Sequence, residues 1–174
     1  MTNFQRIVRR REFTVLILIL VLGAIFSFTT ERFLSISNIS NLLLQLSGVA
    51  ITAIGMTMVI ITGGIDVSAG STLGMACVVS GYFLLGGYSP FLALILAVLV
   101  GLGIGLVNGT IIAWGGIPPI IATLGMMNLI RALMFQILGG KWISGIPPSV
   151  RTIGLGKWLG IPIPMWIAAF LIAI

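Results

Sequence analysis

The sequence predicts an all-α protein, a polytopic bundle of transmembrane helices with about five complete spans and the start of a sixth. Composition is the first observation behind this prediction. Of the 174 residues, 59% are hydrophobic and 7% are charged, and the mean hydropathy is +1.25. Soluble domains carry about 25% charged residues. A soluble chain of this size could not hide so much apolar sequence in one core.

The second observation is the distribution of charge. Residues 13–30, 33–65 and 67–130 contain no charged side chain, and a membrane span needs roughly 20 apolar residues. Gly, Pro and short polar residues divide these runs. The predicted helices cover residues 13–29 and 42–62, a third segment ending near residue 85, then residues 91–114 and 120–138, and a sixth segment from residue 164. Asn38 and Asn41 are expected to be N-caps of the second helix.

We expect a single transmembrane domain with a short cytoplasmic tail. Its predicted parts are residues 1–12 (tail), 13–138 (five spans), 139–163 (a polar loop, expected outside) and 164–174 (the start of the sixth span). Four of the nine basic residues precede the first apolar run: Arg6, Arg9, Arg10 and Arg11. The positive-inside rule then places the N-terminus in the cytoplasm, and the successive spans predict a multi-pass membrane protein. No basic face for nucleic acid is expected.

The predicted outer loop opposes the positive-inside rule. It covers residues 139–163 and carries three basic residues. Either the N-terminal cluster dominates, which we favour, or residues 117–125 form a re-entrant segment.

The sixth segment would cover only about 16 Å of a roughly 30 Å hydrocarbon layer. We therefore expect the sequence to be an N-terminal fragment.

Glycines at four-residue spacing mark the fourth helix. Gly101, Gly105 and Gly109 would form a flat stripe on one face and allow the backbone of another helix to approach closely. The stripe predicts helix packing and a compact bundle.

Asp66 is the only acidic residue after Glu31. A charged carboxylate inside a membrane is costly unless it is paired or hydrated. Gly63, Gly64 and Gly70 can interrupt a helix around it, so that Asp66 and Ser68 would cap the third helix. A direct role with substrate or protons, and pairing with another helix, are the alternatives.

Arg131 is the corresponding charge near the middle of the fifth predicted helix. Such a residue usually faces the bundle interior or a water-filled path, and snorkelling to the interface is the alternative. The isolation of Asp66 and Arg131 in apolar sequence suggests the hypothesis that they pair.

The sequence lacks the residue combinations that several common enzyme mechanisms need. There is no histidine, which excludes a Ser-His pair and zinc motifs of the H-E-x-x-H type. An intramembrane aspartyl dyad would need a second carboxylate in the apolar region. No Walker A motif is present, so ATP hydrolysis would belong to another subunit. We expect neither a cofactor nor a metal.

Four motifs resemble those of one transporter family. Residues 63–71 (GGIDVSAGS) closely resemble the G-G-I-D-[LV]-S-x-G-S signature of permeases that import ribose, other simple sugars and autoinducer-2. Residues 38–42 (NISNL), 105–109 (GLVNG) and 117–125 (IPPIIATLG) resemble the entry to the second helix, the G-x-x-N-G/A motif and the I-P-x-[IF]-[IV]-x-T-L-G motif of that family. Residues 139–143 (GGKWI) look more like the autoinducer-2 branch than the ribose branch.

The resemblance implies a membrane-spanning subunit of an ABC importer in a bacterial inner membrane. Its partners would be a second permease subunit, cytoplasmic ATP-binding subunits and an extracytoplasmic solute-binding protein, all assembled in the lipid bilayer. Family members are about twice as long, and the segment that docks into the ATPase follows the sixth span. The residues placed in the family motifs and near the translocation path are Gly63, Gly64, Asp66, Ser68, Gly70, Ser71, Asn108, Thr123 and Arg131.

Two other functions stay open from the sequence. An ion-coupled secondary transporter would show more intramembrane carboxylates, or broken helices in matching repeats. A truncated permease remnant without transport activity would share all the motifs above.

Overall fold

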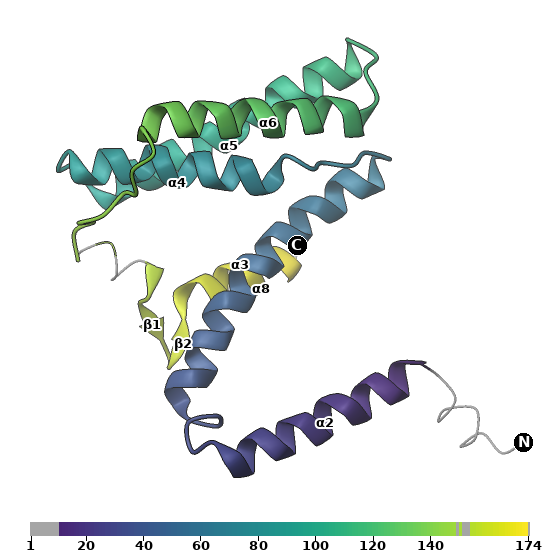
Figure 1. The fold of residues 1–174 in the computed structure, drawn as a ribbon, viewed down its shortest axis with the longest axis vertical. Coiled ribbons are helices and arrows are strands. Elements are labelled where there is room, and N and C mark those ends of the chain that lie inside the picture. Colours follow the sequence, from purple (N-terminus) through teal and green to yellow (C-terminus); the bar gives the residue numbers. More distant parts are fainter. Residues whose placement is uncertain (1–10, 149, 151–153, 174) are drawn as a thin grey trace, which may run out of the picture. The chain divides into compact units, whose positions relative to one another are not determined.

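The computed structural model describes residues 11–148, 150 and 154–173. The predicted cytoplasmic tail, including Arg6, Arg9 and Arg10, lies almost wholly outside the described residues. The helices and strands of the described chain are α2 (Arg11–Thr29), α3 (Ile36–Ile61), α4 (Ala69–Leu85), α5 (Pro90–Ala113), α6 (Pro119–Leu138), β1 (Lys157–Trp158), β2 (Ile161–Pro162) and α8 (Ile163–Ala173). Figure 1 shows these elements along the chain. The predicted all-α class is confirmed.

The lengths of the helices fit a membrane. Three helices are long and apolar enough to cross one, namely α3, α5 and α6. Their 26, 24 and 20 residues correspond to about 39, 36 and 30 Å at 1.5 Å per residue. Two of the predicted spans are shorter apolar helices, at Phe13–Thr29 and Ala69–Leu85. Five complete spans therefore stay a prediction.

The chain divides into two compact units, Met1–Gln45 and Leu46–Ile174. The first unit contains α2, a turn and the beginning of α3. Across that turn the rings of Phe26 and Phe33 stack with centroids 5.8 Å apart. Hydroxyl groups within α2 are satisfied by its own backbone, since Ser27 Oγ donates to the carbonyl of Gly23 at 2.7 Å. Such back-bonding lets a polar side chain stay in an apolar helix.

The start of α3 corrects the sequence prediction. The helix begins at Ile36, six residues before the predicted start at residue 42. Ser35 is its cap, because Ser35 Oγ accepts the backbone N–H of Asn38 at 3.2 Å. Asn38 lies inside the first turn instead, where its side chain donates to the carbonyl of Phe33 at 2.8 Å. The prediction of Asn38 and Asn41 as N-caps was wrong, because a serine upstream occupies that position.

In the second unit α4 packs against both α5 and α6 (Figure 1). Turn chemistry sets the ends of these helices. Ser89 caps α5 by accepting the N–H of Leu92, with Pro90 in the first turn, and α6 likewise carries Pro119 in its first turn. Gly139 ends α6 in the left-handed region, with φ of 57°. Short connections between successive helices bring neighbours together in opposite directions.

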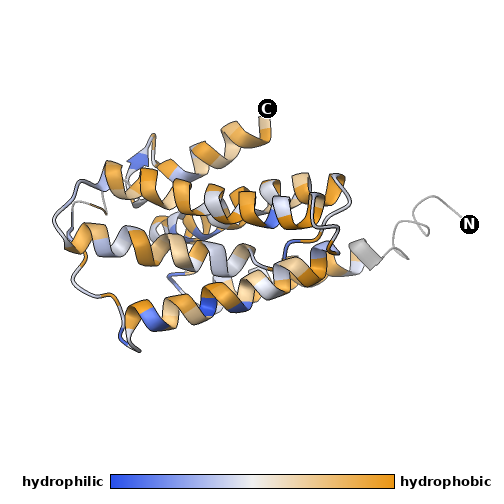
Figure 2. Ribbon diagram, turned by 90° about the horizontal axis from the view of Figure 1, so that it is seen from above, coloured by the Kyte–Doolittle hydropathy of each residue, from blue (hydrophilic) through white to orange (hydrophobic). Residues whose placement is uncertain are grey.

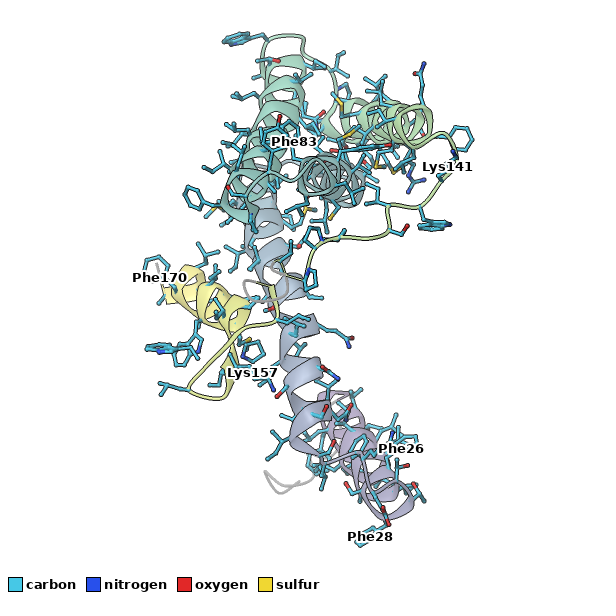
Figure 3. The ribbon with its side chains drawn as sticks, turned by 90° about the vertical axis from the view of Figure 1, so that its left-hand side faces the viewer. Phe26, Phe28, Phe83, Lys141, Lys157 and Phe170 are labelled. Atoms are coloured by element: carbon cyan, nitrogen blue, oxygen red, sulfur yellow. The ribbon has the colours of Figure 1, made fainter. Side chains whose placement is uncertain are left out.

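The close contact between α4 and α6 depends on small residues of α4. A Cβ added to Gly74 would lie 3.1 Å from the sulfur of Met134 on α6, and one added to Gly81 would lie 3.0 Å from Cδ1 of Ile143 in the segment that follows α6. The Tyr82 hydroxyl donates to the carbonyl of Ile137 at 3.0 Å. Lys141 lies just after α6 (Figure 3), so this charge flanks the helix rather than entering it.

A small hairpin, which the sequence did not predict, precedes α8. Strands β1 and β2 are antiparallel, with Trp158 opposite Ile161. The two turn residues, Leu159 and Gly160, both have positive φ, the geometry of tight two-residue hairpins. Trp166 of α8 holds the hairpin by donating its indole N–H to the carbonyl of Trp158 at 3.1 Å.

The interior of the described chain is small, and polar residues make up a large part of it. Six hydrophobic residues are buried, while many large apolar side chains are exposed along every long helix. Figure 2 shows hydrophobic residues around the circumference of the helices rather than on one face. Buried polar residues equal the buried hydrophobic ones in number. This inverted pattern is expected when lipid, not water, surrounds the helices.

Candidate functional site

The segment between α3 and α4 is shaped by two glycines. The N–H of Gly63 bonds to the carbonyl of Ile60 at 2.9 Å, and that of Gly64 to the carbonyl of Val59 at 2.9 Å. Gly63 has a φ of +77°, and a Cβ on Gly64 would lie 3.3 Å from the Val59 carbonyl oxygen. These bonds form a Schellman motif, which closes a helix at a left-handed glycine. The predicted interruption of the helix at Gly63 and Gly64 is confirmed.

Asp66 organises the turn that leads into α4. Its Oδ1 accepts the backbone N–H of Ser68 at 2.7 Å and the Ser68 hydroxyl at 2.6 Å. A carboxylate that accepts the N–H two residues further on forms an Asx turn. Ser68 occupies the N-cap position of α4, but its side chain makes no capping bond. Ser68 therefore occupies the predicted N-cap position. Its hydroxyl does not bond to the helix backbone as a cap would, because it donates to Asp66.

Asn108 connects α5 to this turn. Its Nδ2 donates to Ser68 Oγ at 2.9 Å, and the residue is 5% exposed. Ser68 is fully buried, so its hydroxyl donates to Asp66 and accepts from Asn108 without help from solvent. The other end of the amide, Oδ1 of Asn108, is buried and has no hydrogen-bond partner. A buried acceptor left unpaired costs about 1–3 kcal/mol.

Thr123 connects α6 to the same segment. Its hydroxyl oxygen accepts the N–H of Val67 at 3.2 Å. The hydroxyl lies 2.8 Å from the carbonyl of Pro119 and 3.2 Å from that of Ile65, either of which can receive its proton. Thr123 is 2% exposed. One short polar side chain on α6 thus fixes the extended backbone between α3 and α4.

These contacts define what we call the polar cluster, namely Asp66, Ser68, Asn108 and Thr123. Ser71 adjoins it, donating to the carbonyl of Ser68 at 2.8 Å. Gly70 lies in the first turn of α4, where nothing is within 4 Å of an added Cβ. The structure therefore brings together five of the residues named from the sequence, contributed by one turn and three helices. The roles of Ile65 and Val67 were missed, because only their backbones take part.

Two hollows adjoin the polar cluster. The first, of about 500 Å³, lies among α3, α4 and α5 and is lined largely by apolar and small residues. The second, of about 400 Å³, lies where α3 and α5 end and α6 begins. Both are lined by Val59, Asp66, Gly105 and Asn108. The polar cluster therefore sits where the two hollows meet.

Arg131 lies away from the cluster. It is eight residues beyond Thr123 on α6, which places it about 12 Å further along the helix axis, and its side chain is exposed. Within the described residues Asp66 bonds to Ser68 of its own turn and makes no ion pair with Arg131. The hypothesis of an Asp66–Arg131 pair is not supported, because the Asx turn takes the carboxylate instead.

The glycine stripe on α5 is open in this chain. No atom lies within 4 Å of a Cβ built on Gly101, Gly105 or Gly109, and a hollow of about 570 Å³ runs along them. Their role in helix packing stays a prediction. Among the described residues no group of three or more His, Cys, Asp or Glu could hold a metal.

Apolar helices with a buried polar cluster at their ends define a multi-pass integral membrane protein. Comparison with known proteins makes this specific. A family model described as "Branched-chain amino acid transport system / permease component" matches residues 38–174, and the chain belongs to this permease family.

Three similar curated proteins share the name "Autoinducer 2 import system permease protein LsrC". The protein of Escherichia coli O157:H7 is 36% identical over 94% of this chain and 48% of its own length. That of Yersinia enterocolitica is 35% identical over 98% of this chain and 47% of its own. That of Salmonella typhi is 37% identical over 90% and 45%. The chain thus spans about half the length of the curated relatives it matches. No solved structure gives a significant match.

These findings confirm the resemblance drawn from the four motifs. The relatives are named as permease proteins of an import system, and the chain belongs to a family of transport-system permease components. The family description refers to branched-chain amino acids, and the names of the relatives refer to autoinducer-2. They do not mention ribose or other sugars.

Proposed function

We propose that this chain forms part of the translocation path of an ABC importer, for a simple sugar or an autoinducer-2-like solute. The observation that carries the proposal is the position of the signature at residues 63–71. Its Asp66 and Ser68 hydrogen-bond to each other, Asn108 joins them, and Asp66 and Asn108 line two adjoining hollows. Polar side chains in a membrane protein concentrate along substrate paths.

The proposed assembly follows the importer architecture. A second permease subunit would complete the path, an extracytoplasmic solute-binding protein would deliver the solute, and cytoplasmic ATP-binding subunits would hydrolyse ATP. The chain itself would change conformation without covalent chemistry. Hydroxyl and amide groups such as Ser68 and Asn108 suit a small neutral solute, since a transient site must bind weakly enough to release.

The orientation is also a proposal. With the N-terminus in the cytoplasm, the turn at residues 62–68 and the α5–α6 connection would face the cytoplasm, and residues 139–163 would lie outside. Cysteines placed at the exposed Thr62 and Ser144, each in a Cys77→Ser background, test this with an impermeant thiol reagent on intact cells. We expect labelling at position 144 only. The reverse pattern would contradict the orientation.

Transport is tested with the chain co-expressed with the ATP-binding and solute-binding subunits of an autoinducer-2 import system. We expect the subunits to co-purify, and vesicles to take up labelled autoinducer-2 or ribose only when ATP is supplied. Uptake driven by a proton or sodium gradient without ATP would favour a secondary transporter. Absence of both association and uptake would indicate a remnant.

A further inference from the structure

The direction of the hydrogen bonds fixes how Asn108 is oriented. Asp66 Oδ1 accepts the Ser68 hydroxyl proton, so Ser68 Oγ is left to accept. Only the NH₂ group of Asn108 can then face it. The amide oxygen of Asn108 is consequently turned away from Ser68, and it is the one buried side-chain polar atom without a partner among the described residues.

The unpaired oxygen belongs to a residue that lines both hollows. Asn108 and Asp66 are lining residues of each, and Asp66 is only partly buried. Both residues present acceptor oxygens. No basic side chain lines either hollow, and Arg131 is about 12 Å from Thr123 along α6. Among the described residues the partners of the Asp66 carboxylate are therefore neutral, namely the N–H and hydroxyl of Ser68.

We propose that Asp66 and the amide oxygen of Asn108 form an acceptor-lined waist, which admits hydrogen-bond donors of neutral or positive charge and repels anions. The physical reason is complementarity: an unpaired buried acceptor gains most from a hydroxyl or ammonium donor, and a carboxylate with low-dielectric walls raises the barrier to a second negative charge. The inference rests on the proposed path and adds the chemical class that the path selects.

The test measures which reagents reach the waist. In a Cys77→Ser background, Val59→Cys places a thiol in the wall shared by the two hollows, and Thr72→Cys places one in the first hollow alone. Leu99→Cys, on an exposed part of α5 that lines neither hollow, is the matched control. Each variant in native membranes reacts with a cationic and with an anionic methanethiosulfonate of similar size. Rates are normalised to those with a free thiol in solution.

We expect cysteine at position 59 to react about ten-fold faster with the cationic reagent, since a cleft lined by one sign of charge raises the local concentration of counter-ions. Cysteine at position 72 should show a smaller preference, and that at position 99 should react slowly with both. Adding Asp66→Asn retains an acceptor for the Ser68 N–H and removes the charge, so the preference at position 59 should fall to about two-fold or less. Adding Asn108→Asp should instead raise it.

Two results would overturn the proposal. If neither reagent reaches position 59 or 72, the junction is dry, and the Asn108 oxygen is paired by a helix of another segment or subunit. If both positions react but the charge preference ignores Asp66→Asn and Asn108→Asp, the two residues are only structural. The assay needs neither ATP nor the other subunits. If uptake is absent but the charge preference is found, the proposed function is refuted and the waist is supported. If uptake is found but the charge preference is absent, only the waist is refuted.

Discussion

Glycines of α4 and glycines of α5 have different environments. On α4, Gly74 and Gly81 each admit a side chain from the α6 region, with Met134 and Ile143 within about 3 Å of an added Cβ. On α5, Gly101 and Gly105 have nothing within 4 Å. Glycine thus indicates a place that another chain segment can approach closely, while the presence of a neighbour depends on the tertiary arrangement.

The contact of α4 with α6 also differs in kind from its contact with α5. The α4–α6 contact is steric, with one hydroxyl bond from Tyr82. At the polar cluster α4 and α5 are joined through Ser68 and Asn108. Steric contacts are sensitive to added volume, whereas buried polar contacts are sensitive to a lost partner. Substitutions that separate these two sensitivities test the comparison.

The largest effect is expected for Gly74→Leu. A leucine there would force Met134 aside and separate α4 from α6, because the added Cβ alone lies 3.1 Å from the Met134 sulfur. Overpacking of this kind costs about 1–3 kcal/mol. Thermal unfolding in detergent measures it, and Gly101→Leu is the control with open space. Equal losses in both variants would show that the two glycine faces do not differ.

Ser68→Ala is expected to cost about 1–2 kcal/mol, because it leaves Asn108 Nδ2 without its acceptor in a buried site. The bonds lost are those to Asp66 and Asn108, at 2.6 and 2.9 Å. Ser80→Ala is the control, since that hydroxyl makes one longer bond, 3.2 Å, to the Cys77 carbonyl in its own helix. Unfolding in detergent compares the two, and a matching loss in both would contradict a specific role for the cluster.

Tyr82→Phe should cost about 0.5–1.5 kcal/mol, the usual range for one hydrogen bond. The ring remains to pack, and only the bond from its hydroxyl to the Ile137 carbonyl is removed. Because this bond joins α4 to α6, the loss should be nearly absent in a Gly74→Leu background, where the two helices are already separated. Additive losses in a double-mutant cycle would show that the contacts are independent.

The smallest effect is expected for Gly105→Ala. Nothing lies within 4 Å of the added methyl group, and alanine is favoured over glycine in a helix by about 1 kcal/mol. The chain by itself should therefore be unchanged or slightly stabilised. If the stripe packs against another helix in the assembled transporter, co-purification with its partners should fall. A clear destabilisation of the chain alone would mean that the face is already occupied.

Several local features could be predicted because they depend on neighbouring residues alone. The break at Gly63 and Gly64 follows from the backbone freedom of glycine. The ends of α4, α5 and α6 agree with the predicted bounds within about two residues because Gly, Pro and Ser mark them. The start of α3 was misplaced because Ser35, Asn38 and Asn41 all suit an N-cap, and only the folded turn selects Ser35.

The candidate site was predicted in part. The motifs named Asp66, Ser68, Asn108 and Thr123 separately, and spacing along the chain could not show that they meet. Asn108 is forty residues from Ser68, and Thr123 fifty-six from Val67. The proposed Asp66–Arg131 pair failed for the same reason: isolation in apolar sequence says that a charge needs a partner, not which partner is within reach.

The sequence by itself determined that the protein is an α-helical membrane protein of one permease family, because hydropathy and local turn motifs act over a few residues. Only the tertiary structure decided which glycine face is filled, which side chains form the polar cluster and which way the Asn108 amide points. Those outcomes depend on contacts between distant segments. In a membrane such contacts are selected by shape and by the pairing of buried polar groups rather than by hydrophobicity.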